Sequence, residues 1–344
     1  MAMTERENLL RVIEGKEPGW VPRMGTLQHS YDPENHPPCV EGARAELFPP
    51  QTTASGGRID MFGVEYTPTE DTGGQALPTP NRFIMEDIRK WGDIIKLPSQ
   101  DGIDWRAVGE KATEHIDRTQ SLVQYGGGGG FFMPLMNTMG FTEGLCALHE
   151  EPEACLEFFD YLATYYEVAI NKLIDIIKPD IWRVGDDTAA AQRPFISAKM
   201  YREMIKPFHA RVCKIAYERG LPIDMHCCGR CEDFIDDWRD FGVTMWNPAQ
   251  VSNDLLGIKK KYGNKFVLTG CWDSQGPAGW YESSEEVVRQ AVHDCIDTYA
   301  PGGGFCFWAS YYGPKEDKKV TDHAFWITDE YNKYGRNFYK NGGY

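Results

Sequence analysis

From about residue 120 onward the sequence alternates short β-rich runs with amphipathic helical stretches, and this alternation restricts the fold more than any other feature. Six strand–helix pairs follow one another, a pattern typical of a parallel sheet with helical crossovers. The expected strands are 121–125, 180–184, 222–226, 243–246, 265–269 and 305–308. The pattern therefore predicts an α/β protein built from consecutive βα units.

Two further strands are expected in the irregular N-terminal third, which is rich in proline and glycine. Val21–Met24 supplies a first strand, and a run near Met61–Tyr66 brings the total to eight. Eight βα units close into a (β/α)₈ TIM barrel. We expect residues 1–344 to form a single barrel domain in which the irregular segment 26–120 contains part of the barrel. A doubly wound open sheet is the alternative, and the absence of a dinucleotide fingerprint weakens it.

Charge and hydropathy exclude several functional classes. The formal net charge is −15, and Lys259–Lys261 is the one short basic run that stands out. A nucleic-acid binder normally has a basic face, and a membrane-surface protein has a basic amphipathic helix. The first residues lack the apolar stretch of a signal peptide, and no later run approaches the length that spans a bilayer. We therefore expect a cytoplasmic protein with neither kind of partner.

If the barrel is correct, chemistry belongs where the strands end and the βα loops begin. One such end carries Met225–Cys231, in which His226 and Cys228 lie two residues apart and point to the same side of a strand. Imidazole and thiolate are good zinc ligands, and two of them with a third from another strand are typical of a catalytic zinc site. We expect Cys271 as that third ligand, with Cys306 as the alternative. These groups could instead be ordinary core residues.

Asp186 and Asp187 follow the strand at 180–184 directly. Carboxylates at this position can supply a general base, a metal ligand or a hydrogen bond to a substrate. We predict catalytic roles for both residues. The alternative is that one caps a helix or loop and the other is solvated.

Large and aromatic side chains at the strand ends predict a pocket wall that suits a planar or apolar ligand. The residues expected to bind substrate are Phe132, Met133, Trp246, Asn247, Trp308 and Tyr311. Five consecutive glycines at 126–130 precede the first two of them and predict a tight or flexible βα loop. The run lacks the Gly-Lys-Ser/Thr ending of a phosphate loop, so it does not indicate nucleotide binding.

The chain also resembles a known family. Thr4–Gly15 followed by Val21–Arg23 resembles the opening of the uroporphyrinogen decarboxylase superfamily. Further similarity is found in Gly140–Gly144, Glu151–Glu153, Gly185–Asp187, Ile196–Ser197, Lys206–Pro207 and Tyr299–Phe305. The resemblance spans nearly the whole chain and implies a (β/α)₈ barrel.

The resemblance implies one of two activities. True decarboxylases carry an Arg-Gln-Ala-Gly-Arg segment after the first strand, whereas this chain has Met-Gly-Thr-Leu-Gln-His over 24–29 and lacks the second arginine. The zinc-dependent, corrinoid-dependent methyltransferases of the superfamily have a His-x-Cys pair, which corresponds to His226 and Cys228. Their third ligand is a cysteine beyond the last strand, and this chain has none near Ser310. Cys271, Cys306 or an acidic residue replaces it, or no zinc binds.

The resemblance therefore favours a zinc-assisted methyltransferase. It would move a methyl group between a small substrate, such as an aryl methyl ether, and a corrinoid (cobalamin) carried by a partner protein, in the manner of an O-demethylase. A thiol acceptor activated by zinc is a variant of this hypothesis. The second hypothesis is a metal-free decarboxylase that uses Asp186 or Asp187, and the third is a barrel that only binds a tetrapyrrole or corrinoid partner. A homodimer is compatible with each of them.

Overall fold

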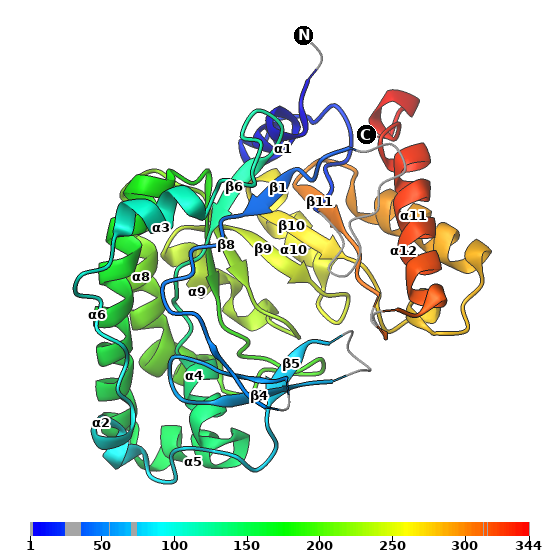
Figure 1. Cartoon of the computed structure of the whole chain (residues 1–344). Coiled ribbons are helices and arrows are strands. Elements are labelled where there is room, and N and C mark those ends of the chain that lie inside the picture. Colours follow the sequence, from blue (N-terminus) through cyan, green and yellow to red (C-terminus); the bar gives the residue numbers. More distant parts are fainter. Residues whose placement is uncertain are drawn as a thin grey trace.

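The computed structural model describes residues 3–24, 36–54, 56–69, 74–311, 313–314 and 316–343. Its main sheet has seven parallel strands in the order β1-β6-β7-β8-β9-β10-β11 (Figure 1). They are β1 Val40–Gly42, β6 Leu122–Tyr125, β7 Ile181–Gly185, β8 Ile223–His226, β9 Val243–Ala249, β10 Val267–Cys271 and β11 Phe305–Trp308. All six strands expected after residue 120 are confirmed.

The segment before residue 25 closes the sheet into a ring. Arg23 forms a parallel bridge with Phe307 of β11, and the Met24 N–H donates to the Phe307 carbonyl at 3.0 Å. On its other side the Arg23 carbonyl accepts from the Cys39 N–H, immediately before β1, at 3.2 Å. The expected first strand therefore lies between β11 and β1 as a short bridge. The predicted TIM-barrel fold is confirmed. The departure from the decarboxylase motif at 24–29 lies largely outside the described residues.

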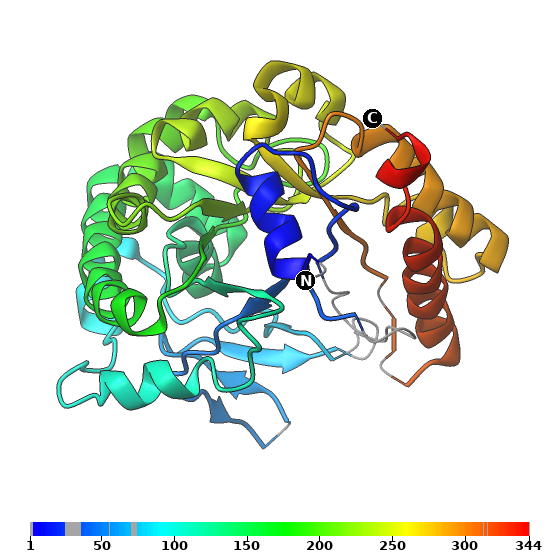
Figure 2. The same ribbon diagram turned by 90° about the horizontal axis from the view of Figure 1, so that it is seen from above.

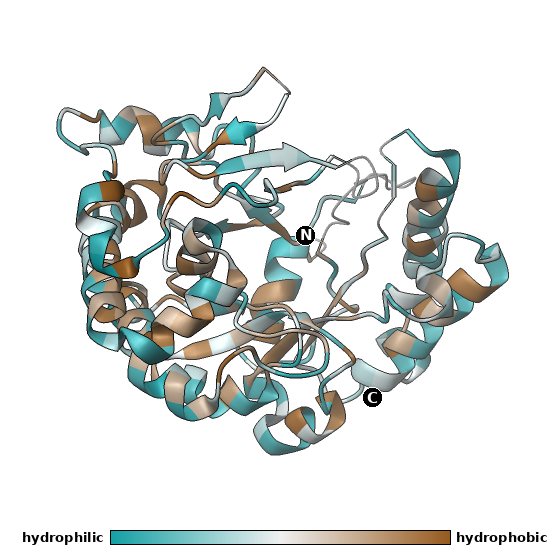
Figure 3. Ribbon diagram, turned by 90° about the horizontal axis from the view of Figure 1, so that it is seen from below, coloured by the Kyte–Doolittle hydropathy of each residue, from teal (hydrophilic) through white to brown (hydrophobic). Residues whose placement is uncertain are grey.

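The helices cover the outer face of the barrel, as Figure 2 shows. They include α3 Trp105–Lys111, α4 Phe132–Met139, α5 Phe141–Glu150, α6 Pro152–Ile177, α8 Lys206–Tyr217, α9 Ile235–Asp240, α10 Leu255–Tyr262, α11 Glu285–Tyr299 and α12 Lys318–Glu330, with the short α2 Trp91–Ile94 and α7 Ala198–Met200. Their apolar stripes are buried against the strands and their polar faces point outward (Figure 3). Among the described residues, no helix is long and apolar enough to cross a membrane.

Helix α1, Glu5–Ile13, covers the end of the barrel where the strands begin (Figure 2). Thr4 starts it with a capping box, in which its hydroxyl accepts from the Glu7 N–H and the Glu7 carboxylate accepts from the Thr4 N–H. Leu9 and Val12 then pack into a cluster of buried residues formed by Cys39, Val40, Leu122, Ile181, Met245, Val267 and Cys306. Cys306 is part of this apolar layer, so its expected role as an alternative metal ligand is not supported by its position.

A second sheet is antiparallel and consists of β2 Gln51–Thr52, β3 Arg58–Ile59, β4 Glu65–Pro68 and β5 Ala76–Pro78. It lies at the end of the barrel opposite α1 (Figure 1). The expectation of a barrel strand at Met61–Tyr66 is wrong, because the Asp60 carboxylate accepts from the N–H groups of Phe62 and Val64 and folds this stretch into a turn. The barrel strand of this region is β1, whose three residues have no hydrophobic run.

Candidate active site

A cavity of about 760 Å³ opens where the barrel strands end. Side chains from six of the strands and their loops line it, among them Arg44, Arg183, Asp187, His226, Cys228, Asn247, Cys271, Trp272 and Trp308. Gln75, next to β5, also contributes to the wall, so the small antiparallel sheet forms part of the rim. The cavity lies at the position where TIM-barrel enzymes have their active sites.

Three potential metal ligands meet in this cavity. One donor atom each from Asp187, His226 and Cys228 lies within 4.8 Å of the other two, and the Cys228 Sγ is 3.9 Å from the His226 Nε2. Within the part of the chain that the structure describes, this is the one group of three or more such side chains. Carboxylate, imidazole and thiolate are the side chains that hold zinc, so the donor set fits this ion.

Backbone geometry holds the two loops of the site together. The Cys228 N–H donates to the Asp187 Oδ1 at 2.7 Å, which ties the loop after β8 to the loop after β7. Gly229 follows with φ +90°, and a Cβ at that position would lie 2.6 Å from the carbonyl oxygens of Ala189 and Ala190. Only glycine fits this turn without a shift of the backbone. The turn directs the chain away immediately after Cys228.

A chain of hydrogen bonds orients His226. Its Nδ1 is 2.7 Å from the Asn247 Oδ1, and the Asn247 Nδ2 donates to the Asp224 Oδ2 at 2.5 Å. Gln124 donates to the same carboxylate oxygen at 2.8 Å. Because an amide oxygen can only accept, the His226 Nδ1 carries the proton and the Nε2 lone pair is available as a ligand.

Burial sets the protonation of these groups. It lowers the pKa of His226 below its ordinary value, and the nearby Arg183 charge lowers it further, so the imidazole is neutral at neutral pH. Burial raises the pKa of the Cys228 thiol, and it raises the pKa of the Asp224 carboxyl to about 6. Without a metal ion the site therefore contains a neutral imidazole and a protonated thiol.

Asp186 faces away from the cavity and has a different set of partners. Its side chain is fully buried and accepts from the N–H groups of Phe131, Phe132 and Met133 at 2.8 Å each. The His209 Nε2 lies 3.2 Å from its Oδ2. Asp186 thus binds the first N–H groups of α4, which is the capping role considered above as the alternative. The expectation that Asp186 is catalytic is corrected to a structural role.

Cys271 is outside the group of three ligands. It is buried at the end of β10 with φ +57°, and the Cys295 thiol donates to its carbonyl at 3.4 Å. Although it lines the cavity wall, the structure brings Asp187, and not Cys271, next to His226 and Cys228. An acidic residue therefore takes the position expected for this cysteine.

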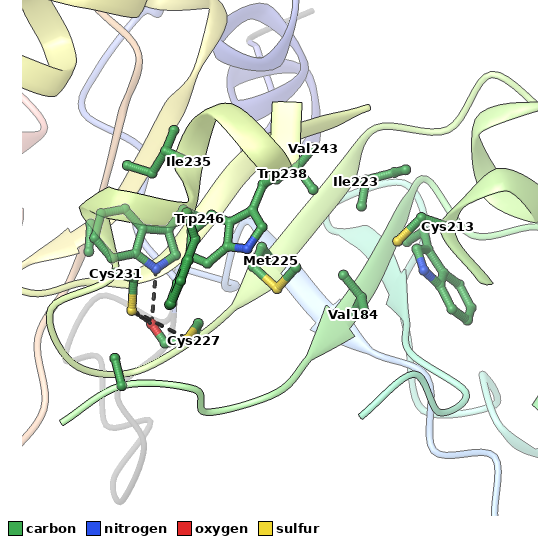
Figure 4. Packing of buried hydrophobic residues seen from close by; sticks show 14 of the residues in the cluster. Val184, Cys213, Ile223, Met225, Cys227, Cys231, Ile235, Trp238, Val243 and Trp246 are labelled. Atoms are coloured by element: carbon green, nitrogen blue, oxygen red, sulfur yellow. Dashed lines mark hydrogen bonds between the residues drawn. The ribbon is translucent and has the colours of Figure 1, made fainter. Parts of the chain in front are cut away.

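Two of the six expected substrate-binding residues, Asn247 and Trp308, line the cavity. The other four do not. Trp246 is adjacent to Asn247 on the same strand and must point to the opposite face, where it packs on Trp238 and its Nε1 donates to the Cys227 carbonyl (Figure 4).

The remaining three belong to the helical layer. Phe132 stacks on Phe195, and Tyr311 stacks on His323 of α12 with 4.1 Å between ring centroids. Met133 lies in the first turn of α4, where its N–H binds Asp186. Sequence reasoning missed Arg183 and Arg44, which do line the cavity. Arg183 lies two residues before Gly185 on β7, so both residues face the same side of the strand. The alternation of side chains along the strand could therefore have identified Arg183 as an inward-facing residue.

Only one of the three cysteines in Met225–Cys231 faces the cavity. Cys227 and Cys231 lie on the outer side with Trp246 and Trp238, and the two Sγ atoms are 3.3 Å apart (Figure 4). Thr188 contacts the Cys227 Sγ at 3.4 Å through both its N–H and its hydroxyl. These two thiols fill the core next to the site, and Cys228 alone contributes to the ligand group.

Residues 60–310, well over half of the chain, match the family model described as uroporphyrinogen decarboxylase (URO-D). The chain belongs to the uroporphyrinogen decarboxylase family. A solved structure described as a methyltransferase from Methanosarcina mazei is similar in fold, with a TM-score of 0.59 and 13% sequence identity over 96% of this chain and 100% of that one. A search of curated proteins finds no match. The family membership predicted from the sequence motifs is thus confirmed, and the structural likeness supports the same barrel.

Proposed function

We propose that this member of the uroporphyrinogen decarboxylase family is a zinc-dependent methyltransferase that moves a methyl group between a small substrate and a corrinoid protein. The observation that carries the proposal is the convergence of Asp187, His226 and Cys228 in the barrel cavity. Three protein ligands from His, Cys and acidic residues are the set that catalytic zinc sites use, with one position left for a substrate atom. The methyltransferase activity of the structural neighbour agrees with this assignment.

The residues of the site have distinct roles in this proposal. Bound zinc supplies a Lewis acid that stabilises the heteroatom from which the methyl group leaves, and the corrinoid supplies the cobalt nucleophile. His226 is held with its Nε2 toward the ligand group by Asn247, and Asp187 is fixed by the Cys228 N–H. Trp272 and Trp308 give the cavity an aromatic wall, which suits an aryl methyl ether. The volume of the cavity, about 760 Å³, is within the range of sites that bind small molecules.

Metal analysis and a methyl-transfer assay test the proposal together. We expect about one zinc per chain, and zinc-dependent formation of methylcobalamin from reduced cobalamin with methoxyphenols as donors. Full activity after zinc removal would contradict the role of zinc. Release of carbon dioxide from a carboxylated substrate without cobalamin would favour the decarboxylase alternative, and tight corrinoid binding without turnover would favour a non-catalytic barrel.

The protonation states predict how zinc binding depends on pH. His226 is already neutral, because its pKa is lowered, whereas Cys228 must lose its proton because burial raises the pKa of its thiol. Zinc binding should therefore release about one proton, and the zinc affinity should rise about tenfold per pH unit between about pH 6.5 and 8.5. Calorimetry in buffers of different ionisation enthalpy counts the proton. An affinity independent of pH would show that the thiol is not a ligand.

Asn247 should affect zinc binding without contacting the ion. Asn247→Ala removes the acceptor that fixes the His226 Nδ1, and zinc affinity should fall about 10- to 100-fold. Ser274→Ala is a control for a polar change in the same cavity, because Ser274 lines it and lies on the loop after β10, away from the strands that carry the three ligands. Competition with a chelating dye measures both variants. Equal affinities in the two variants would exclude the orienting role of Asn247.

A further inference from the structure

Arg183 places a positive charge at the wall of the cavity, and no ion pair of its guanidinium is found within the described residues. It lies on β7 opposite Asp224 of β8, and its side chain lines the cavity. Asp224 is an acidic neighbour of Arg183, but its Oδ2 accepts from Asn247 and Gln124, and within the described residues no hydrogen bond joins its carboxylate to the guanidinium. Arginine is costly to keep in a partly enclosed site unless an anion or water binds it.

The charges that line the cavity do not balance. Within the described part of the chain, the lining contains Arg44 and Arg183 and one carboxylate, that of Asp187. A divalent zinc ion bound by Asp187 and by the Cys228 thiolate is neutralised by these two ligands. Arg183 and Arg44 then leave an excess of positive charge at this cavity of about 760 Å³, which the neighbouring Asp224 offsets only in part. Arg183 is close to the ligand group in the fold, since it lies on the strand that leads to Asp187 and opposite Asp224, two residues before His226.

We propose that the substrate carries a carboxylate or a related oxyanion, and that Arg183 binds it while the reacting end of the molecule faces Asp187, His226 and Cys228. This inference rests on the proposed function, because it assumes that the cavity is the substrate site. The planar guanidinium binds carboxylate and phosphate oxygens through two parallel hydrogen bonds. With the aromatic wall of Trp272 and Trp308, this chemistry selects aryl carboxylates with a methyl group on a heteroatom.

Calorimetry with a pair of probes that differ only in the charged group tests the inference. In the zinc-loaded protein, 4-methoxybenzoate should bind at least about tenfold more tightly than uncharged methoxybenzene, as expected for charge-assisted hydrogen bonds. Arg183→Met, which keeps the length of the side chain, should abolish this difference, and Arg183→Lys should retain part of it. Inorganic phosphate should compete with 4-methoxybenzoate if any oxyanion is accepted, and should not compete if the site is specific for carboxylates.

Several results would overturn the inference. The first is equal affinity for the two probes, and the second is no measurable binding of 4-methoxybenzoate. The third is an Arg183→Met protein that unfolds at the wild-type temperature and binds 4-methoxybenzoate with wild-type affinity. If Arg183→Met does not fold, then equal affinity in Arg183→Lys and the wild type has the same meaning. Zinc content, measured on the same samples, separates this test from the proposed function. If the protein never takes up zinc but still binds 4-methoxybenzoate in a way that depends on Arg183, the anion site is supported and the proposed zinc-dependent function is contradicted.

Discussion

The Cys228→Ser variant is expected to lose its zinc and its methyl-transfer activity while the barrel remains folded. Cys228 is the one sulfur donor of the ligand group, and a serine hydroxyl is a far weaker ligand. Loss of a direct ligand should weaken zinc binding by more than the roughly 100-fold typical of an outer contact. The rate of methyl transfer should fall about 1000-fold, since a Lewis acid contributes several kcal/mol to such a step.

Cys271→Ser is the control for this experiment. Both cysteines lie at the cavity, but only Cys228 is within 4.8 Å of Asp187 and His226 as a group. The Cys271 variant should therefore retain about one zinc per chain. Metal analysis after dialysis against a weak chelator compares the two proteins. If Cys271→Ser loses zinc and Cys228→Ser keeps it, the ligand set given by the structure is incorrect.

Removal of the neighbouring carboxylates of Asp186 and Asp187 should have opposite effects on stability and on zinc binding. Asp186→Ala should lower the free energy of unfolding by about 3–5 kcal/mol, because it leaves three N–H groups at the start of α4, two of them buried, and His209 without their acceptor. Asp187→Ala removes an acceptor for one backbone N–H, and should cost about 1 kcal/mol. The same change should remove zinc, which Asp186→Ala should retain for as long as the protein is folded.

Urea unfolding and metal analysis on both variants measure these effects. Chelated, zinc-free protein provides the stability comparison, since a bound ion would itself stabilise the folded state. An Asp186→Ala protein with wild-type stability but no activity would return Asp186 to a catalytic role. Similar losses of stability in the two variants would show that Asp187 also supports the fold.

The repeating part of the fold could be predicted from the sequence, because each βα unit contains its own hydrophobic pattern. The N-terminal part could not. β1 has the sequence Val-Glu-Gly and is fixed by its hydrogen bonds to β6, which no local pattern indicates. Met61–Tyr66 has the composition of a strand, but the Asp60 carboxylate folds its first half into a turn. Tertiary contacts outweighed β propensity in both places.

The candidate site was predictable where two ligands share one strand, as His226 and Cys228 do. The third ligand depends on a distance between loops from different strands, and the sequence does not contain that distance. Asp186 and Asp187 are chemically identical neighbours, and only the direction of the chain after β7 separates a helix contact from a cavity contact. Trp246 was assigned to the pocket on its type, although its adjacent Asn247 already occupied the inward position.

Helix α1 has a kinetic consequence for the proposed reaction. Because it closes one end of the barrel with the packed layer around Leu9 and Val12, the cavity opens toward the other end, where the strands finish. A small substrate and a large corrinoid carrier would have to use that same opening. The small molecule must then enter before the carrier docks, and the demethylated product must wait until the carrier leaves. Turnover should accordingly follow a compulsory order, with excess carrier acting as an inhibitor.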